Sequence, residues 1–185
     1  MRRNAMLLAS LALALGAPLR AAARPPLPGY AELKLGGYFP VASDVSSYDA
    51  GFSGELALGY APDPGFAFEG AVGTFRTQHT VAGATARSLR VIPLTFAIRG
   101  TVPLKSFQPY AILGAGAYFV HDELGGASDD SANLGLFLGV GGNVSLGERL
   151  FLGLEGRYLF LRANTFGAGT HLDGAMLTAD LGFRF

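Results

Sequence analysis

The sequence predicts an all-β protein, an eight-stranded antiparallel up-and-down β-barrel that crosses a membrane. Three observations predict this fold. The 185 residues include 27 glycines, and each glycine inside a helix costs about 1 kcal/mol relative to alanine. From residue 30 onward, bulky apolar residues alternate with small or polar ones, which is the period of a β-strand. The alternating segments are about 9 to 11 residues long, the length with which a tilted strand spans a bilayer.

The composition excludes several other classes of protein. Half of the residues are hydrophobic, which argues against intrinsic disorder. The chain has no cysteine, and this excludes a disulfide-stapled module and a cysteine-ligated metal site. Basic and acidic residues are equal in number at 14 each, with no basic cluster longer than Arg2 and Arg3. We therefore expect no binding to nucleic acid, which requires a patch that neutralises phosphates.

The N-terminal residues predict a cleavable signal peptide. Arg2 and Arg3 precede an apolar stretch from Ala5 to Leu19, and the alanines at 21–23 give the small-residue pattern that a signal peptidase accepts. A membrane anchor requires about 20 apolar residues, and this stretch is shorter. The predicted organisation is a signal peptide at residues 1–23, a periplasmic N-terminal segment at 24–29 and a β-barrel domain at 30–185.

Eight alternating segments supply the predicted strands. They cover residues 31–39, 52–60, 66–75, 90–99, 110–120, 132–144, 150–160 and 175–185. One face of each segment is bulky and nearly uncharged, and the other is mostly glycine and alanine with single charged residues. In the fifth segment, the bulky face is predicted to consist of Tyr110, Ile112, Tyr118 and Val120.

The character of the two faces decides which solvent each one meets. In a soluble sandwich or barrel, the face opposite the core would be rich in Lys, Glu, Thr and Gln. Here that face is small, which suits the crowded interior of a barrel of about eight strands. The bulky face often ends in Tyr or Phe, as expected for a lipid-facing band with aromatic girdles. Closure is then required, because in hydrocarbon each backbone polar group needs an internal partner.

The connections alternate in length along the chain. Those at 40–51, 76–89, 121–131 and 161–174 are long, and those at 61–65, 100–109 and 145–149 are short and turn-like. Long loops outside the cell and short periplasmic turns are the pattern of outer-membrane barrels.

Several short motifs resemble those of a known family. They are Val91-Ile92-Pro93-Leu94, Pro109-Tyr110-Ala111, Leu154-Glu155-Gly156-Arg157-Tyr158 and the terminal Leu181-Gly182-Phe183-Arg184-Phe185. Over roughly residues 28–185 the chain resembles the small eight-stranded outer-membrane β-barrel proteins of Gram-negative bacteria, the porin-like, OmpA- and OmpW-like group. The resemblance implies a place in the bacterial outer membrane after export through the inner membrane. It also implies that the barrel-assembly machinery recognises Leu181, Phe183 and Phe185.

Strand parity places nine charged residues in the lumen of the predicted barrel. They are Glu32, Lys34, Glu55, Glu69, Arg99, Glu155, Arg157, Asp180 and Arg184. An unpaired charge in a poorly hydrated interior is costly, so the mixture of signs predicts a network of salt bridges and hydrogen bonds. Two roles are open for this network: a structural one that fills the lumen, which we favour, and a polar plug or gate for water and ions.

Candidate catalytic and metal-binding residues are few. His79, His121 and His171 fall in predicted outside loops near acidic residues, but their spacing matches no known ligand motif. Enzymatic barrels that hydrolyse lipids place a Ser, a His and an acid together near the outer rim, and no His-x-Ser pair occurs in the sequence. We therefore expect no enzymatic activity, no metal and no cofactor.

Three classes of function follow. The first is a monomeric integral outer-membrane protein with a structural or surface-interaction role and a charge-plugged lumen, whose partners are outer-membrane lipids, lipopolysaccharide and the assembly machinery. The alternative is a narrow porin-like conduit for small or apolar solutes, although nine lumen charges argue against a wide path. The third and least favoured is an outer-membrane lipid-modifying enzyme.

Overall fold

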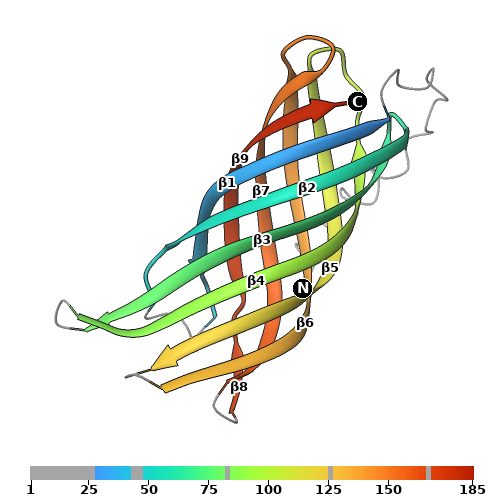
Figure 1. The fold of residues 1–185 in the computed structure, drawn as a ribbon. Coiled ribbons are helices and arrows are strands. Elements are labelled where there is room, and N and C mark those ends of the chain that lie inside the picture. The colour runs from blue at the N-terminus through green and yellow to red at the C-terminus, as the bar shows by residue number, and fades with distance from the viewer. Residues whose placement is uncertain (1–27, 43–47, 82–83, 125–126, 166–167) are drawn as a thin grey trace, which may run out of the picture.

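The computed structural model describes residues 28–42, 48–81, 84–124, 127–165 and 168–185. The chain forms a closed antiparallel β-barrel (Figure 1). Its strands are β1 (Gly29–Pro40), β2 (Gly51–Asp63), β3 (Phe66–Val81), β4 (Ala84–Thr101), β5 (Phe107–Leu124), β6 (Ala127–Ser145), β7 (Leu150–Thr165), β8 (Ala168–His171) and β9 (Gly174–Arg184). Within the described residues, no helix is long and apolar enough to cross a membrane.

Eight of these strands make the barrel wall, each paired with the next. The circle closes where β9 pairs with β7 on one side and with β1 on the other. The short β8 pairs with the far end of β7, opposite residues 162–165. The predicted all-β, eight-stranded antiparallel barrel is therefore confirmed. The predicted signal peptide lies outside the described residues and stays a prediction.

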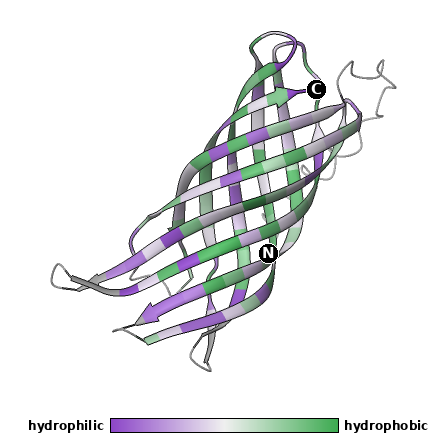
Figure 2. Cartoon of the chain, viewed as in Figure 1, coloured by the Kyte–Doolittle hydropathy of each residue, from purple (hydrophilic) through white to green (hydrophobic). Residues whose placement is uncertain are grey.

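Alternation along each strand separates a lipid-like outer face from the interior. On β6, the side chains of Leu134, Leu136 and Leu138 are exposed, whereas Phe137 between them is buried. The other long strands repeat this pattern, and Figure 2 shows apolar residues in a band around the middle of the barrel. A strand has a period of two, so one bulky face per strand is enough to build this band.

The predicted face of the fifth strand is wrong. Tyr110, Ile112, Tyr118 and Val120 of β5 are all buried inside the barrel, and Phe119 is among the residues that point outward. Both faces of this strand are apolar, so its own pattern does not fix its phase. The neighbouring strand β6 determines which face of β5 points inward, because glycines of β6 leave room for the tyrosine rings of β5. A Cβ at residue 141 would collide with Tyr110, and one at 135 would collide with Tyr118.

Three of the four predicted long loops are instead continuations of the strands. β3 and β4 stay paired up to Val81 and Ala84, β5 and β6 up to Leu124 and Ala127, and β7 and β8 up to Thr165 and Ala168. We call this end of the barrel the hairpin end. The opposite end, with tight connections at 64–65, 102–106 and 146–149, is the turn end. His79, His121 and His171 accordingly lie on strands rather than in loops.

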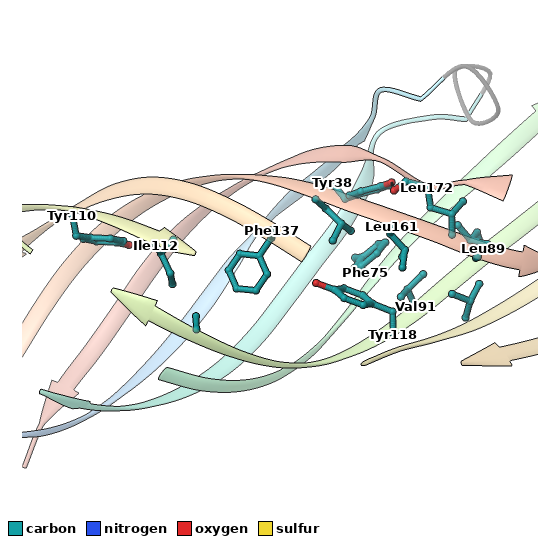
Figure 3. Packing of buried hydrophobic residues seen from close by; sticks show 14 residues of the cluster. Tyr38, Phe75, Leu89, Val91, Tyr110, Ile112, Tyr118, Phe137, Leu161 and Leu172 are labelled. Carbon is teal, nitrogen blue, oxygen red and sulfur yellow. Dashed lines mark hydrogen bonds between the residues drawn. The ribbon is translucent and has the colours of Figure 1, made fainter. Parts of the chain in front are cut away.

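The interior is arranged in three levels from the turn end to the hairpin end. A small cluster near the turn end contains Tyr30, Ala67 and Phe151. Charged residues occupy the middle level. A larger apolar cluster begins beside the charged level with Tyr110 and Ile112 and extends toward the hairpin end, where it includes Tyr38 and Phe75. Figure 3 shows its side chains arranged one after another between the strands.

Candidate functional site

The middle level of the interior is a cluster of charged side chains from five strands. Lys34 on β1 is its central base and is almost completely buried. Its Nζ lies 2.8 Å from Glu69 Oε1, 3.1 Å from Glu155 Oε2 and 3.5 Å from Glu32 Oε2. The three carboxylates belong to β1, β3 and β7, so this one ammonium group connects three strands inside the barrel.

Arg99 of β4 binds two of the same acids. Its Nη1 and Nη2 donate to Glu32 Oε1 and Oε2 at 3.1 and 2.7 Å, and Nη2 also donates to Glu69. The guanidinium carbon lies 4.1 Å from the centre of the Tyr110 ring and 5.2 Å from that of Tyr30. Such paired hydrogen bonds and aromatic contacts offset the cost of taking the charge out of water.

Arg157 of β7 completes the cluster from the opposite side. Its Nη1 lies 2.9 Å from Glu55 Oε1, its Nη2 lies 3.5 Å from Glu69 Oε1, and its Nε donates to Glu155. Its guanidinium carbon also lies 4.7 Å from the centre of the Phe137 ring. Arg157 therefore contacts three acids and one aromatic ring.

Two tyrosines extend the cluster with neutral donors. Tyr30 Oη donates to Glu69 Oε2 at 3.0 Å, and Tyr110 Oη donates to Glu155 Oε2 at 2.9 Å. Neither tyrosine was predicted to belong to the cluster, because Tyr30 lies at the boundary of the first predicted strand and Tyr110 was assigned to the lipid face. Seven of the nine predicted lumen charges converge here: Glu32, Lys34, Glu55, Glu69, Arg99, Glu155 and Arg157.

The other two predicted lumen charges form no ion pair with this cluster among the described residues, although Asp180 is paired with Lys34 across β9 and β1. Asp180 is buried, and its Oδ1 accepts from Thr178 Oγ1 at 2.8 Å. Its Oδ2 and the nearby Asn143 Oδ1 have no hydrogen-bond partner among the described residues. Arg184 is half-buried at the turn end, where it donates to Ser145 Oγ and Gln108 Oε1 and stacks on Phe151.

The apolar level on the hairpin side of the charged cluster was not predicted from the sequence as a layer of its own. Tyr38 stacks on Phe75 with ring centres 4.5 Å apart, and its hydroxyl donates to the Leu172 carbonyl at 2.9 Å (Figure 3). The signal in the sequence was Phe137, a large residue on the face of its segment that otherwise carries glycine and asparagine. A cavity of about 10 Å³ lined by Lys34, Ser53, Glu55, Glu155, Arg157, Met176 and Thr178 lies at the charged level. This volume holds roughly one water molecule.

The hairpin end carries ion pairs of its own. Asp122 on β5 is fully buried and accepts from Arg87 Nε at 2.8 Å. The ring of His121 joins two acids, with Nδ1 2.6 Å from Asp130 Oδ1 and Nε2 3.2 Å from Glu123 Oε1. These hydrogen bonds, the one to Asp130 first, raise the pKa of His121 above its usual value. No group of three or more potential ligands among the described residues is arranged to hold a metal ion.

Comparisons with known proteins agree with this architecture. The family model described as outer membrane protein beta-barrel domain matches residues 7–185. The chain belongs to this family. Its structure is similar to that of Neisserial surface protein A, with 19% identity, a TM-score of 0.69, and coverage of 85% of this chain and 97% of that one. No curated protein sequence matches the chain.

Two further solved barrels have a similar fold. Ail, the attachment invasion locus protein of Yersinia pestis, is 12% identical with a TM-score of 0.59, covering 85% of this chain and 97% of that one. The outer membrane protein OprG from Pseudomonas aeruginosa is 14% identical with a TM-score of 0.59, covering 86% and 97%. At these identities the comparison shows the fold alone. The predicted relationship to small Gram-negative outer-membrane barrels is confirmed.

The C-terminal residues of this outer-membrane barrel lie at the seam where it closes. Leu181, Phe183 and Phe185 are exposed on the outside. The backbone of Phe185 exchanges two hydrogen bonds with Gly29, at 2.8 and 3.0 Å. These positions make the three residues accessible from the lipid side, and their role as an assembly signal stays a prediction.

Proposed function

We propose that this protein is a non-enzymatic, integral barrel of the bacterial outer membrane that displays its hairpin end outside the cell for surface interactions. The observation that carries the proposal is the contrast between a filled interior and three long projecting hairpins. The hairpins extend the wall and place polar residues beyond the apolar band (Figure 2). Such exposed ends are where outer-membrane barrels vary and bind.

The filled interior supports a structural role for the charged cluster. Lys34, Glu32 and Glu155 each have about 1% or less of their surface exposed, and the cavity beside them is about 10 Å³. A conduit for solutes requires a continuous path lined by groups that can exchange water for solute. The cluster, closed on its hairpin side by Tyr38 and Phe75, weighs against such a path.

The hairpin end also supports a binding role more than a catalytic one. His121 contacts two carboxylates, an arrangement that stabilises its charged form. A general base for a nucleophile must instead be neutral and hydrogen-bonded to that nucleophile. We infer that this histidine holds β5 and β6 together at the outer rim.

We further propose export through the inner membrane and assembly as a monomer. Within the barrel wall each strand is paired on both sides, so the wall offers no open strand edge to which a second copy could add. The terminal Leu181, Phe183 and Phe185 are the proposed contact for the barrel-assembly machinery. Outer-membrane lipids and lipopolysaccharide are the proposed surroundings of the apolar band.

Cysteine labelling tests the proposed orientation, because the natural chain contains no cysteine. Ser128→Cys places a thiol at the hairpin end, and Lys105→Cys places one at the turn end; both residues are exposed. A membrane-impermeant maleimide applied to intact cells is expected to label Ser128→Cys and to reach Lys105→Cys after lysis. Labelling of Lys105→Cys in intact cells, with Ser128→Cys protected, would overturn the orientation.

A further inference from the structure

Two arginines face each other on the outside of the barrel, at the hairpin-side edge of the apolar band. Arg76 on β3 and Arg90 on β4 are directly paired across the strands, and both are exposed. Side chains in such a position have Cβ atoms about 5 Å apart, and like charges there repel each other. Neither guanidinium has an ion-pair partner among the described residues.

The row of residues continues around the barrel and becomes acidic. Arg90 is paired with His121 on β5, and His121 with Asp130 on β6. His121 lies between Arg90 and Asp130, and its Nδ1 is 2.6 Å from Asp130 Oδ1, so the carboxylate pairs with the histidine. The positive charge is therefore concentrated on β3 and β4.

An apolar surface lies immediately below this row. Ile92 is paired with Phe119, and Phe119 with Ala132, one step closer to the middle of the apolar band. Together with Arg90, His121 and Asp130, these residues line a groove of about 620 Å³ on the outer surface. The groove is thus apolar on its membrane side and charged on its hairpin side.

We propose that Arg76, Arg90 and this groove form a binding site for a phosphorylated lipid of the outer leaflet. A phosphate monoester carries a charge of about −1.5 to −2 at neutral pH, which matches two adjacent guanidiniums. Guanidinium groups also bind phosphate through paired hydrogen bonds. Ile92 and Phe119 then contact the first part of the acyl chains. The location in the outer leaflet rests on the orientation proposed above.

Binding of lipid A to the purified barrel in non-ionic micelles tests this site, with native mass spectrometry as the readout. The probes are bis-phosphorylated lipid A and the same lipid with both phosphates removed. We expect the wild-type chain to bind the phosphorylated form at least ten-fold more tightly. Arg76→Gln/Arg90→Gln is expected to lose this preference. Arg162→Gln is the matched control, because Arg162 is an exposed arginine on β7 that shares its hollow with Asp173, and it is expected to retain the preference.

Equal binding of the two lipids, or a full preference in the double variant, would overturn the site. Complete competition by millimolar inorganic phosphate would also overturn it, because the groove would then contribute nothing. Micelles have no inside or outside, so this result is independent of the orientation test with cysteine.

Thermal unfolding provides a second readout that a general loss of stability would not mimic. In non-ionic detergent, Arg90→Gln removes repulsion from Arg76 and is expected to raise the unfolding midpoint. With phosphorylated lipid A present, the wild-type midpoint is expected to rise above that of the variant. A variant with the lower midpoint in both conditions, or with the higher midpoint in both, would contradict the proposal.

Discussion

At the scale of single residues, a buried charge is stabilised by contacting more than one group of opposite charge. This is the case for Glu69, Glu155 and Arg157. Taking an ion out of water costs several kcal/mol, and the cost is offset where its partners surround it. The buried Asp180 differs from them. Its hydrogen bond comes from a neutral threonine, and no ion pair to it is found among the described residues.

Arg157→Ala is expected to destabilise the barrel by about 3 to 5 kcal/mol, because it leaves Glu55 and Glu155 with fewer cationic partners inside the barrel. The measurement is the free energy of unfolding in denaturant, with the protein in detergent micelles. The exposed Arg162→Ala on the same strand serves as the control and should change stability little. A midpoint for Arg157→Ala equal to wild type would show that the cluster contributes nothing to stability.

Asp180→Asn is expected to leave stability unchanged or to increase it. The amide keeps the shape of the side chain, removes a buried charge and can donate to the unpartnered Asn143 Oδ1. Glu69→Gln is the matched comparison and should destabilise the barrel, because Glu69 accepts from Lys34 and Arg99. The same unfolding experiment compares the two, and equal destabilisation by both would contradict the distinction.

His121 is expected to titrate above its usual pKa of about 6.5, because Asp130 and Glu123 stabilise the imidazolium. Because the pKa of His121 is higher in the folded than in the unfolded protein, the charged histidine stabilises the fold. This contribution is complete at a pH below the unfolded-state pKa and is lost as the pH rises through the folded-state pKa. Titration by NMR measures it, and Asp130→Asn should lower the pKa. An unshifted His121 would mean that these contacts do not form in solution.

At the scale of the strand, alternation was enough to predict seven of the eight outer faces and the pairing into a closed sheet. It failed on β5, where Tyr110 and Leu113 are both large and apolar and the phase depends on glycines of β6. The alternation pattern also predicted strand ends too early. The hairpins continue with polar residues such as Gln78 and Ser88, which are directly paired across β3 and β4. Both the inward face of β5 and the length of the hairpins depend on residues of the neighbouring strand, so the sequence of one segment alone does not predict them.

Leu138→Arg is expected to destabilise the barrel by about 2 to 4 kcal/mol, because Leu138 lies on the outer face within the apolar band, where an arginine would meet lipid. Ser128→Arg, on the same strand and the same face but at the hairpin end, is the control and should cost about 0 to 1 kcal/mol. Unfolding of both variants in lipid bilayers measures the difference. A neutral Leu138→Arg would place that face outside the hydrocarbon.

At the scale of the whole molecule, the filled interior combines a feature that could be predicted with one that could not. The charged residues were predicted, because a charge on the small face of a strand can lie only in the lumen. The apolar level that Phe75 and Leu161 form was not, because large apolar residues on both faces look alike in sequence. That Asp180 forms no ion pair with the cluster depends on side-chain geometry, which strand parity does not specify.

Single-channel recording in a planar bilayer tests the central claim, a closed barrel with a filled interior. The refolded chain without residues 1–23 is first run boiled and unboiled on an SDS gel, where a shift in mobility establishes that the barrel has formed. We predict that this folded protein gives no discrete current steps. Reproducible steps of one size from the heat-modifiable form would contradict the account and favour a conduit.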